Sequence, residues 1–276
     1  MSVNCDCERT SREYSYGNSE VDTSVDTRTK IDNRQYYYDN TIDYFELPYC
    51  QSIGEEAFKG SSIKSISAPE CKIIKTGAFQ DTEKWEGETF VDFSGVTEIE
   101  YLGLSGIRNT DIGASYHVYI DLSSIKTIGE EGLSGSICLC YGFDPDRLEL
   151  PNLEFLGRRA LWTGVSAYSQ DFSYINLPSI KTLKWCCLSH ISMKGAFEAH
   201  FGPNLTLIED GLFFDRWVQS DYTGCNLYFE SVTPPALMGT FGCDVDHIYV
   251  PVESVEAYKA ASVWSTYASV ISAIPT

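Results

Sequence analysis

The chain has 276 residues, with 39 acidic against 20 basic side chains and a formal net charge of −19. This acidity argues against binding of nucleic acid or of anionic membrane surfaces, because both favour clusters of Lys and Arg. No apolar run of 18 residues occurs, which argues against membrane insertion.

Residues 1–40 are predicted to form a polar N-terminal arm. A Val-Asp-Thr phrase begins at Val21 and again at Val25, and Tyr36, Tyr37 and Tyr38 follow. The segment has too few apolar residues to build a core of its own. Two interpretations remain open: a disordered tail leading into a cap strand near residues 34–47, or an arm that docks on a larger assembly through these five residues.

The first residues lack the basic and apolar regions of a signal peptide. We therefore expect a cytoplasmic or virion-associated protein, or a cell-surface protein if a leader was removed.

A repeated phrase dominates the sequence between residues 41 and 227. It reads apolar-x-apolar-Pro, then Ile or Leu five residues after the Pro site, then a small residue beside Phe or Leu. The Ile/Leu position recurs seven times, at Ile53, Ile74, Ile99, Ile128, Leu156, Leu183 and Ile208. Alternation before Pro predicts a short strand with one buried face. A repeat of this length predicts a solenoid, in which each unit buries its apolar side against its neighbours.

This pattern resembles the BspA-like subfamily of leucine-rich repeats, whose units read L-x-x-I-x-L-P-x-x-L-x-x-I-x-x-x-A-F and which, as the resemblance implies, occurs in gut bacteria and their phages. The resemblance implies a β-rich α/β solenoid of about seven units over residues 41–227 and a strand-helix capping unit over 228–276. One helical face of that cap is predicted to carry Tyr258, Ala261, Trp264, Ala268 and Ile271. Ser94 and Ser123 replace Pro in the third and fourth units, which predicts distortion there.

The ten cysteines suggest packing more than chemistry. Cys50 and Cys71 occupy an apolar column of the repeat, and Cys187 occupies the small site. The pairs Cys5-x-Cys7 and Cys138-x-Cys140 lack the spacing and the His partners of a zinc site. The four histidines fall in different units, and no catalytic motif occurs. We therefore expect no metal, no cofactor and no enzymatic activity.

Aromatic residues outside the repeat consensus gather in the connecting segments, where length varies most. They include Trp85, Tyr116, Trp162, Tyr168, Trp217 and Tyr222. Exposed Trp and Tyr are frequent hot spots of interfaces and stack on sugar rings. The alternative is that each folds back onto the solenoid as part of its core.

Two functional hypotheses follow. The first is a non-catalytic solenoid of the adhesion or receptor-recognition type, which binds a protein or a cell-surface glycan. The alternative is a structural virion component of a phage tail or fibre, anchored through residues 1–40.

Overall fold

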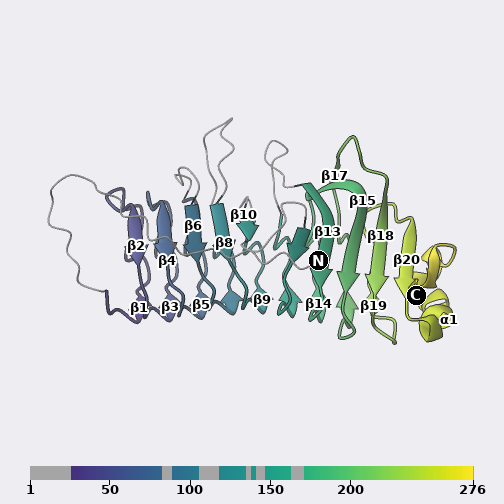
Figure 1. Ribbon diagram of the computed structural model, residues 1–276. Coiled ribbons are helices and arrows are strands. Elements are labelled where there is room, and N and C mark those ends of the chain that lie inside the picture. The colour runs from purple at the N-terminus through teal and green to yellow at the C-terminus, as the bar shows by residue number, and fades with distance from the viewer. Residues whose placement is uncertain are drawn as a thin grey trace, which may run out of the picture.

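The structure is a computed structural model that describes residues 26–82, 89–105, 118–134, 138–140, 147–162 and 171–275. It is an elongated parallel β-solenoid of about eight turns, with two rows of strands along its length and a small helical cap at the C-terminal end (Figure 1). The predicted β-rich repeat solenoid is thereby confirmed. Among the described residues, no helix is long or apolar enough to cross a membrane.

One row is a continuous nine-stranded sheet of two-residue strands. In each strand the second residue is the Ile or Leu of the repeat, and its side chain is buried in the core. All seven predicted positions are found here, and Ile31 and Leu237 add one strand at each end. The strands are β1 (Lys30–Ile31), β3 (Ser52–Ile53), β5 (Ile73–Ile74), β7 (Glu98–Ile99), β9 (Thr127–Ile128), β12 (Phe155–Leu156), β14 (Thr182–Leu183), β16 (Leu207–Ile208) and β19 (Ala236–Leu237).

The other row is divided into two parallel sheets. The five-stranded sheet contains β2 (Tyr44–Glu46), β4 (Ser65–Ser67), β6 (Thr89–Asp92), β8 (Val118–Asp121) and β10 (Cys138–Cys140). The seven-stranded sheet contains β11 (Arg147–Glu149), β13 (Asp171–Leu177), β15 (Ser192–Phe201), β17 (Trp217–Val218), β18 (Gly224–Phe229), β20 (His247–Val250) and β21 (Ile271–Ala273). The division follows the fourth repeat unit.

The two units in which Ser replaces Pro keep their strands in the sheet. The amide of Ser94 donates a 3.1 Å hydrogen bond to Oδ1 of Asp92, and that of Ser123 donates a 2.9 Å bond to Oδ1 of Asp121. Proline has no amide hydrogen, so a replacement there needs an acceptor. Each Ser comes two residues after an Asp that supplies one. β6 and β8 pair over four residues, so the predicted distortion is not found between these two strands. β4 of the preceding unit pairs with β6 through Ser67 and Asp92 alone.

A hydrogen-bonded turn follows each strand of the nine-stranded sheet and links consecutive turns of the solenoid. The amide of the large apolar residue donates to the carbonyl of the small residue in the next unit, as from Phe58 to Ala78 at 2.7 Å and from Leu133 to Ala160 at 2.9 Å. The third residue after the buried Ile or Leu adopts a left-handed conformation. This column holds Arg34, Glu56, Gly77, Leu102, Glu131, Arg159, Cys186 and Gly211, with φ between 49° and 71°.

The core is a single column of aliphatic and aromatic side chains that runs through the stack. Cys50, Cys71 and Cys187 are fully buried in it, as the repeat predicts. The two C-x-C pairs lie outside the described side chains, which exclude residues 1–25 and the side chains of 138–140.

The C-terminal cap differs from the single helix that the spacing predicts. The chain forms the 3-10 turn η1 (Val252–Ser254), helix α1 (Val255–Ala260), the 3-10 turn η2 (Trp264–Tyr267) and strand β21, which pairs with β20. Val263 has φ 64°, a left-handed conformation that ends the helical path. Tyr258, Trp264 and Ile271 are nevertheless all buried, so the apolar spacing identified the buried residues but not their secondary structure.

The repeat also extends beyond both predicted domain boundaries. β1 lies before residue 41, and Ile31 pairs with Ile53. At the other end, β18 crosses residue 228 and β19 continues the nine-stranded sheet. The first turn is closed by Tyr36, whose ring stacks on Phe58 at 5.1 Å, while the guanidinium of Arg28 lies 5.8 Å from the centre of the Tyr36 ring.

Candidate functional site

The outward face of the seven-stranded sheet carries a row of aromatic and charged side chains. Strands in this sheet bury alternate residues, such as Ala199 and Phe201 in β15. The residues between them therefore point to solvent. The outward positions are Arg147 and Glu149 on β11, Tyr174 and Asn176 on β13, Glu198 and His200 on β15, Asn226 and Tyr228 on β18, and His247 and Tyr249 on β20.

The rings in this row stack on one another along the solenoid axis. The centroids of His200 and Tyr228 are 4.1 Å apart with planes inclined by 5°, and those of Tyr228 and Tyr249 are 4.7 Å apart. The Tyr174 ring lies beside the stack, 4.9 Å from His200 and tilted by 39°, because Tyr174 pairs with Glu198 and not with His200. The parallel register places these residues on neighbouring strands, since His200 pairs with Tyr228 and Tyr228 with Tyr249. We call Tyr174, His200, Tyr228 and Tyr249 the ring ladder.

Charged groups flank the ring ladder on the same face. Nε2 of His200 lies 3.3 Å from Oε2 of Glu198, and the hydroxyl of Tyr228 donates to Oε1 of Glu198 at 3.5 Å. At the other end, the Arg147 guanidinium lies 3.7 Å from the centre of the Tyr174 ring. Burial raises the pKa of the Tyr174 and Tyr228 hydroxyls, so both stay protonated donors at neutral pH.

The stacking decides which part of each ring a partner can reach. The faces of His200 and Tyr228 are covered by their neighbours at 4–5 Å, so the ring edges and their polar atoms face outward. Sugar rings are recognised by stacking on free aromatic faces, and this ladder offers few. It offers instead a flat row of hydroxyl and imidazole groups for hydrogen bonding.

The ring ladder was not among the residues that the sequence predicts as a contact surface. Its members occupy the variable position x of the apolar-x-apolar phrase and the position two residues earlier. Down the chain, x changes from Glu46, Ser67, Asp92, Asp121, Glu149 and Asn176 to His200, Tyr228 and Tyr249. This change was the available signal, and it lies inside the repeat, where polar residues are expected by default.

Of the predicted contact residues, Trp162 joins a second cluster. Its indole meets the His190 ring edge-on at 5.4 Å, and the Arg159 guanidinium lies 5.8 Å from it and 4.9 Å from the Trp185 ring. Nε2 of His190 lies 3.3 Å from Oδ2 of Asp215. The cluster is partly exposed, so Trp162 stays a candidate contact residue.

Tyr222 is partly buried and packs against the core, which raises the pKa of its hydroxyl to about 12. This fits the alternative in which a loop aromatic folds back onto the solenoid. Trp217 lies in β17, which pairs with β15, but its side chain is not described. Trp85, Tyr116 and Tyr168 lie outside the described residues.

Of the five predicted anchoring residues, the structure describes three. Val21 and Val25 lie outside the described residues, and Tyr36 packs into the first turn. Tyr37 and Tyr38 are 41% and 55% exposed and meet edge-on at 4.7 Å.

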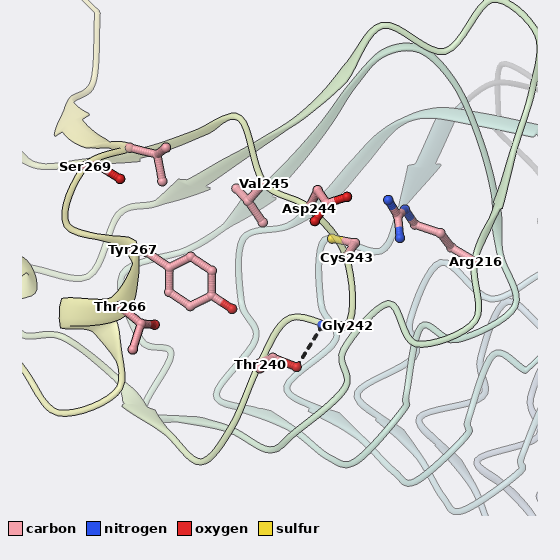
Figure 2. A pocket seen from close by; sticks show the side chains of 10 residues that line it. Arg216, Thr240, Gly242, Cys243, Asp244, Val245, Thr266, Tyr267 and Ser269 are labelled. Atoms are coloured by element: carbon pink, nitrogen blue, oxygen red, sulfur yellow. Dashed lines mark hydrogen bonds between the residues drawn. The ribbon is translucent and has the colours of Figure 1, made fainter.

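A cavity of about 550 Å³ opens between the last solenoid turn and the cap (Figure 2). Arg216, the residue just before β17, points into this cavity toward Cys243 and Asp244. Thr266, Tyr267 and Ser269 line the cavity from the cap. The Nε atom of Arg216 is buried and has no hydrogen-bond partner among the described residues.

No group of three or more His, Cys, Asp or Glu side chains that could hold a metal ion is found in the described part of the chain. No protein-family model matches the sequence. No curated protein matches it either.

Proposed function

We propose that this protein is a non-catalytic, BspA-like leucine-rich-repeat solenoid of the adhesion or recognition type, and that it binds a protein partner across the ring ladder. The observation that carries the proposal is the stack of His200, Tyr228 and Tyr249, with the tilted ring of Tyr174 beside it. The repeat type rests on the resemblance of the sequence pattern, in which the strand columns follow the phrase position by position.

The chemistry of the face favours binding over catalysis. The side chains of Glu198 and His200 are 36% and 26% exposed on the outward face of the sheet, so water reaches both groups. A flat face with rigid aromatic side chains, an Arg at one end and few lysines has the composition of a protein interface.

The position of the ring faces favours a protein over a glycan. A pyranose ring gains most from a free aromatic face, whereas a polypeptide can pair its polar groups with ring edges. Toward the N-terminus four of the six residues in the outward column are acidic, namely Glu46, Asp92, Asp121 and Glu149, and the other two are Ser67 and Asn176. A partner with basic residues opposite this acidic half would be favoured by charge complementarity.

The alternative, a virion component anchored through residues 1–40, gains no support from residues 30–38. These residues are hydrogen-bonded into the first turn, as from the Tyr36 amide to Ala57 and from the Tyr38 amide to Lys59.

The proposal can be tested with panels of immobilised extracellular proteins and surface glycans. Wild-type protein is compared with the double variant His200→Ser, Tyr228→Ser and with the control Tyr101→Ser, which removes a 47% exposed ring from another face. We expect binding to at least one protein, weakened tenfold or more by the double variant and unchanged by the control. Binding to glycans alone would favour the glycan alternative, and binding that the double variant leaves intact would exclude the ring ladder.

A further inference from the structure

Two cysteines of consecutive turns interact beside the cavity below the cap, and one of them, Cys243, lines it. Cys225 lies on β18 with its side chain buried, and Cys243 lies in the loop that leads into β20. Two hydrogen bonds fix the surrounding backbone: the Cys225 amide donates to Oδ2 of Asp246 at 2.7 Å, and the Asp246 amide donates to the Cys225 carbonyl at 2.9 Å. The two thiols are hydrogen-bonded to each other.

The two thiols differ in their access to solvent. Cys225 is fully buried, whereas Cys243 is partly exposed and lines the cavity. Figure 2 shows the Cys243 side chain beside that of Asp244, with the Arg216 guanidinium directed toward both. A reagent that enters the cavity therefore reaches Cys243, whereas Cys225 is closed to it.

The surroundings also shift the pKa values of the two thiols in opposite directions. The hydrogen bond from Cys225 lowers the pKa of Cys243, with the charge of Arg216 adding to the effect and with burial, Asp244 and Asp246 opposing it. The same thiol hydrogen bond, together with burial, raises the pKa of Cys225. A reactive cysteine is a thiolate within reach of solvent, often with a resolving thiol beside it.

We propose that Cys243 and Cys225 are a redox-active pair that hydroperoxides convert to a disulfide. The Cys243 thiolate attacks the terminal oxygen of the hydroperoxide, the O–O bond breaks, and the products are a Cys243 sulfenic acid and an alkoxide or hydroxide. Cys225 sulfur then attacks the Cys243 sulfur, the S–O bond breaks, and water leaves as the S–S bond forms. Each protein sulfur is oxidised by one electron, and the peroxide is reduced by two.

Arg216 has a defined role in this proposal. Its buried Nε has no hydrogen-bond partner among the described residues, and its positive charge acts on the Cys243 thiol and lowers the pKa of that thiol. A fixed cation there stabilises the thiolate.

The chain contains a natural comparison in Cys50 and Cys71. Their Sγ atoms donate to the carbonyls of Ser52 and Ile73 at 3.3 and 3.4 Å, and the interaction with Cys71 lowers the pKa of Cys50 to about 7. Both side chains are 0% exposed, so a peroxide has no path to them in the folded protein. A thiol that has a low pKa but is closed to solvent should not react with peroxide. The comparison of the two cysteine pairs therefore separates the effect of pKa from the effect of solvent access.

The test is oxidation of the reduced, full-length protein with one equivalent of hydrogen peroxide, followed by peptide mass spectrometry without reduction. We expect a Cys225–Cys243 cross-link with loss of two hydrogen atoms, formed in the folded protein and reversed by a thiol reductant. In Cys225→Ser, dimedone should label Cys243 as the trapped sulfenic acid. In Cys243→Ser, neither product should form at these positions.

One further variant and a folding check keep the test independent of misfolding. Cys50→Ser should oxidise like the wild type, because its thiol takes no part. Each variant is first shown to keep the wild-type circular dichroism and melting curve. Cross-linking only after denaturation, sulfenic acid trapped first at Cys225, or oxidation of Cys50 before Cys243 would each overturn the proposal.

Discussion

The ring of Phe58 stacks on the ring of Phe79, with centroids 5.0 Å apart and planes inclined by 13°, and the Phe58 amide donates to the carbonyl of Ala78 beside it. The pair explains why the repeat couples a small residue to a large one. The small residue lets the backbones of two turns approach to hydrogen-bond distance, and the large residue fills the space inside. The stability of each turn therefore depends on its contacts with the neighbouring turns.

Replacing Phe58 by Ala should destabilise the N-terminal turns. The side chain is 0% exposed and contacts the rings of Tyr36, Phe45 and Phe79. We expect a loss of about 3–5 kcal/mol in urea unfolding, because a cavity is left between stacked rings. Hydrogen exchange should accelerate in residues 30–80 before it does near the C-terminus. Tyr49→Ala, which removes a 53% exposed ring, is the control, and an equal loss in both variants would contradict this account.

The left-handed column predicts a preference for glycine at two positions. Gly77 has φ 63°, and a Cβ placed there would find no atom closer than 3.4 Å, so the penalty of Gly77→Ala is conformational. We expect a loss of about 1 kcal/mol. At Leu102, with φ 53°, the Gly variant should be more stable than the Ala variant by a similar amount. Thermal unfolding of the four proteins checks the prediction, and an Ala variant as stable as its Gly counterpart at both positions would refute it.

Trp264 should control the stability of the C-terminal cap. Its ring is 1% exposed and meets Phe229 and Tyr258 edge-on at 5.0 and 4.8 Å, and its Nε1 donates to the Pro235 carbonyl at 2.8 Å. Trp264→Ala should lower the free energy of unfolding by about 3–5 kcal/mol.

In Trp264→Phe most of the packing stays and the Pro235 carbonyl loses its donor. We expect a smaller loss, about 1–3 kcal/mol, in the same denaturation experiment. If both variants lost the same amount, the packing of the ring would contribute nothing beyond the hydrogen bond.

The reactivity of Cys243 should depend on pH in a way that sets it apart from an ordinary thiol. Its pKa is lowered by the Cys225 hydrogen bond and by Arg216, against burial and the charges of Asp244 and Asp246. The thiolate therefore forms at lower pH, and the midpoint of iodoacetamide alkylation should lie below the usual value of about 8.5. Arg216→Gln should move the midpoint upward and Arg216→Lys should partly restore it. A midpoint that Arg216→Gln leaves unchanged would exclude an electrostatic role for this residue.

The sequence was sufficient to predict the solenoid and its register. Ile53 and the six later Ile or Leu positions recur with Phe58 and its equivalents because every turn must bury the same two side chains. The same logic placed Cys50, Cys71 and Cys187 in the core, where burial is confirmed. It did not recognise Ile31 and Leu237 as further strands, because Gln35 follows the first where a small residue is expected and Pro234-Pro235 stands just before the second.

Only the tertiary structure decided which residues meet. His200 and Tyr228 are 28 residues apart in the sequence, and only the parallel register places their rings face to face. Cys225 and Cys243 have no motif spacing, and they interact because one is buried on a strand and the other lies on the loop that leads into the next strand. A repeat reveals the positions that every turn shares, since packing imposes them on each copy. Contacts made by one pair of turns depend on connection lengths and loop paths, which the packing of the core leaves free.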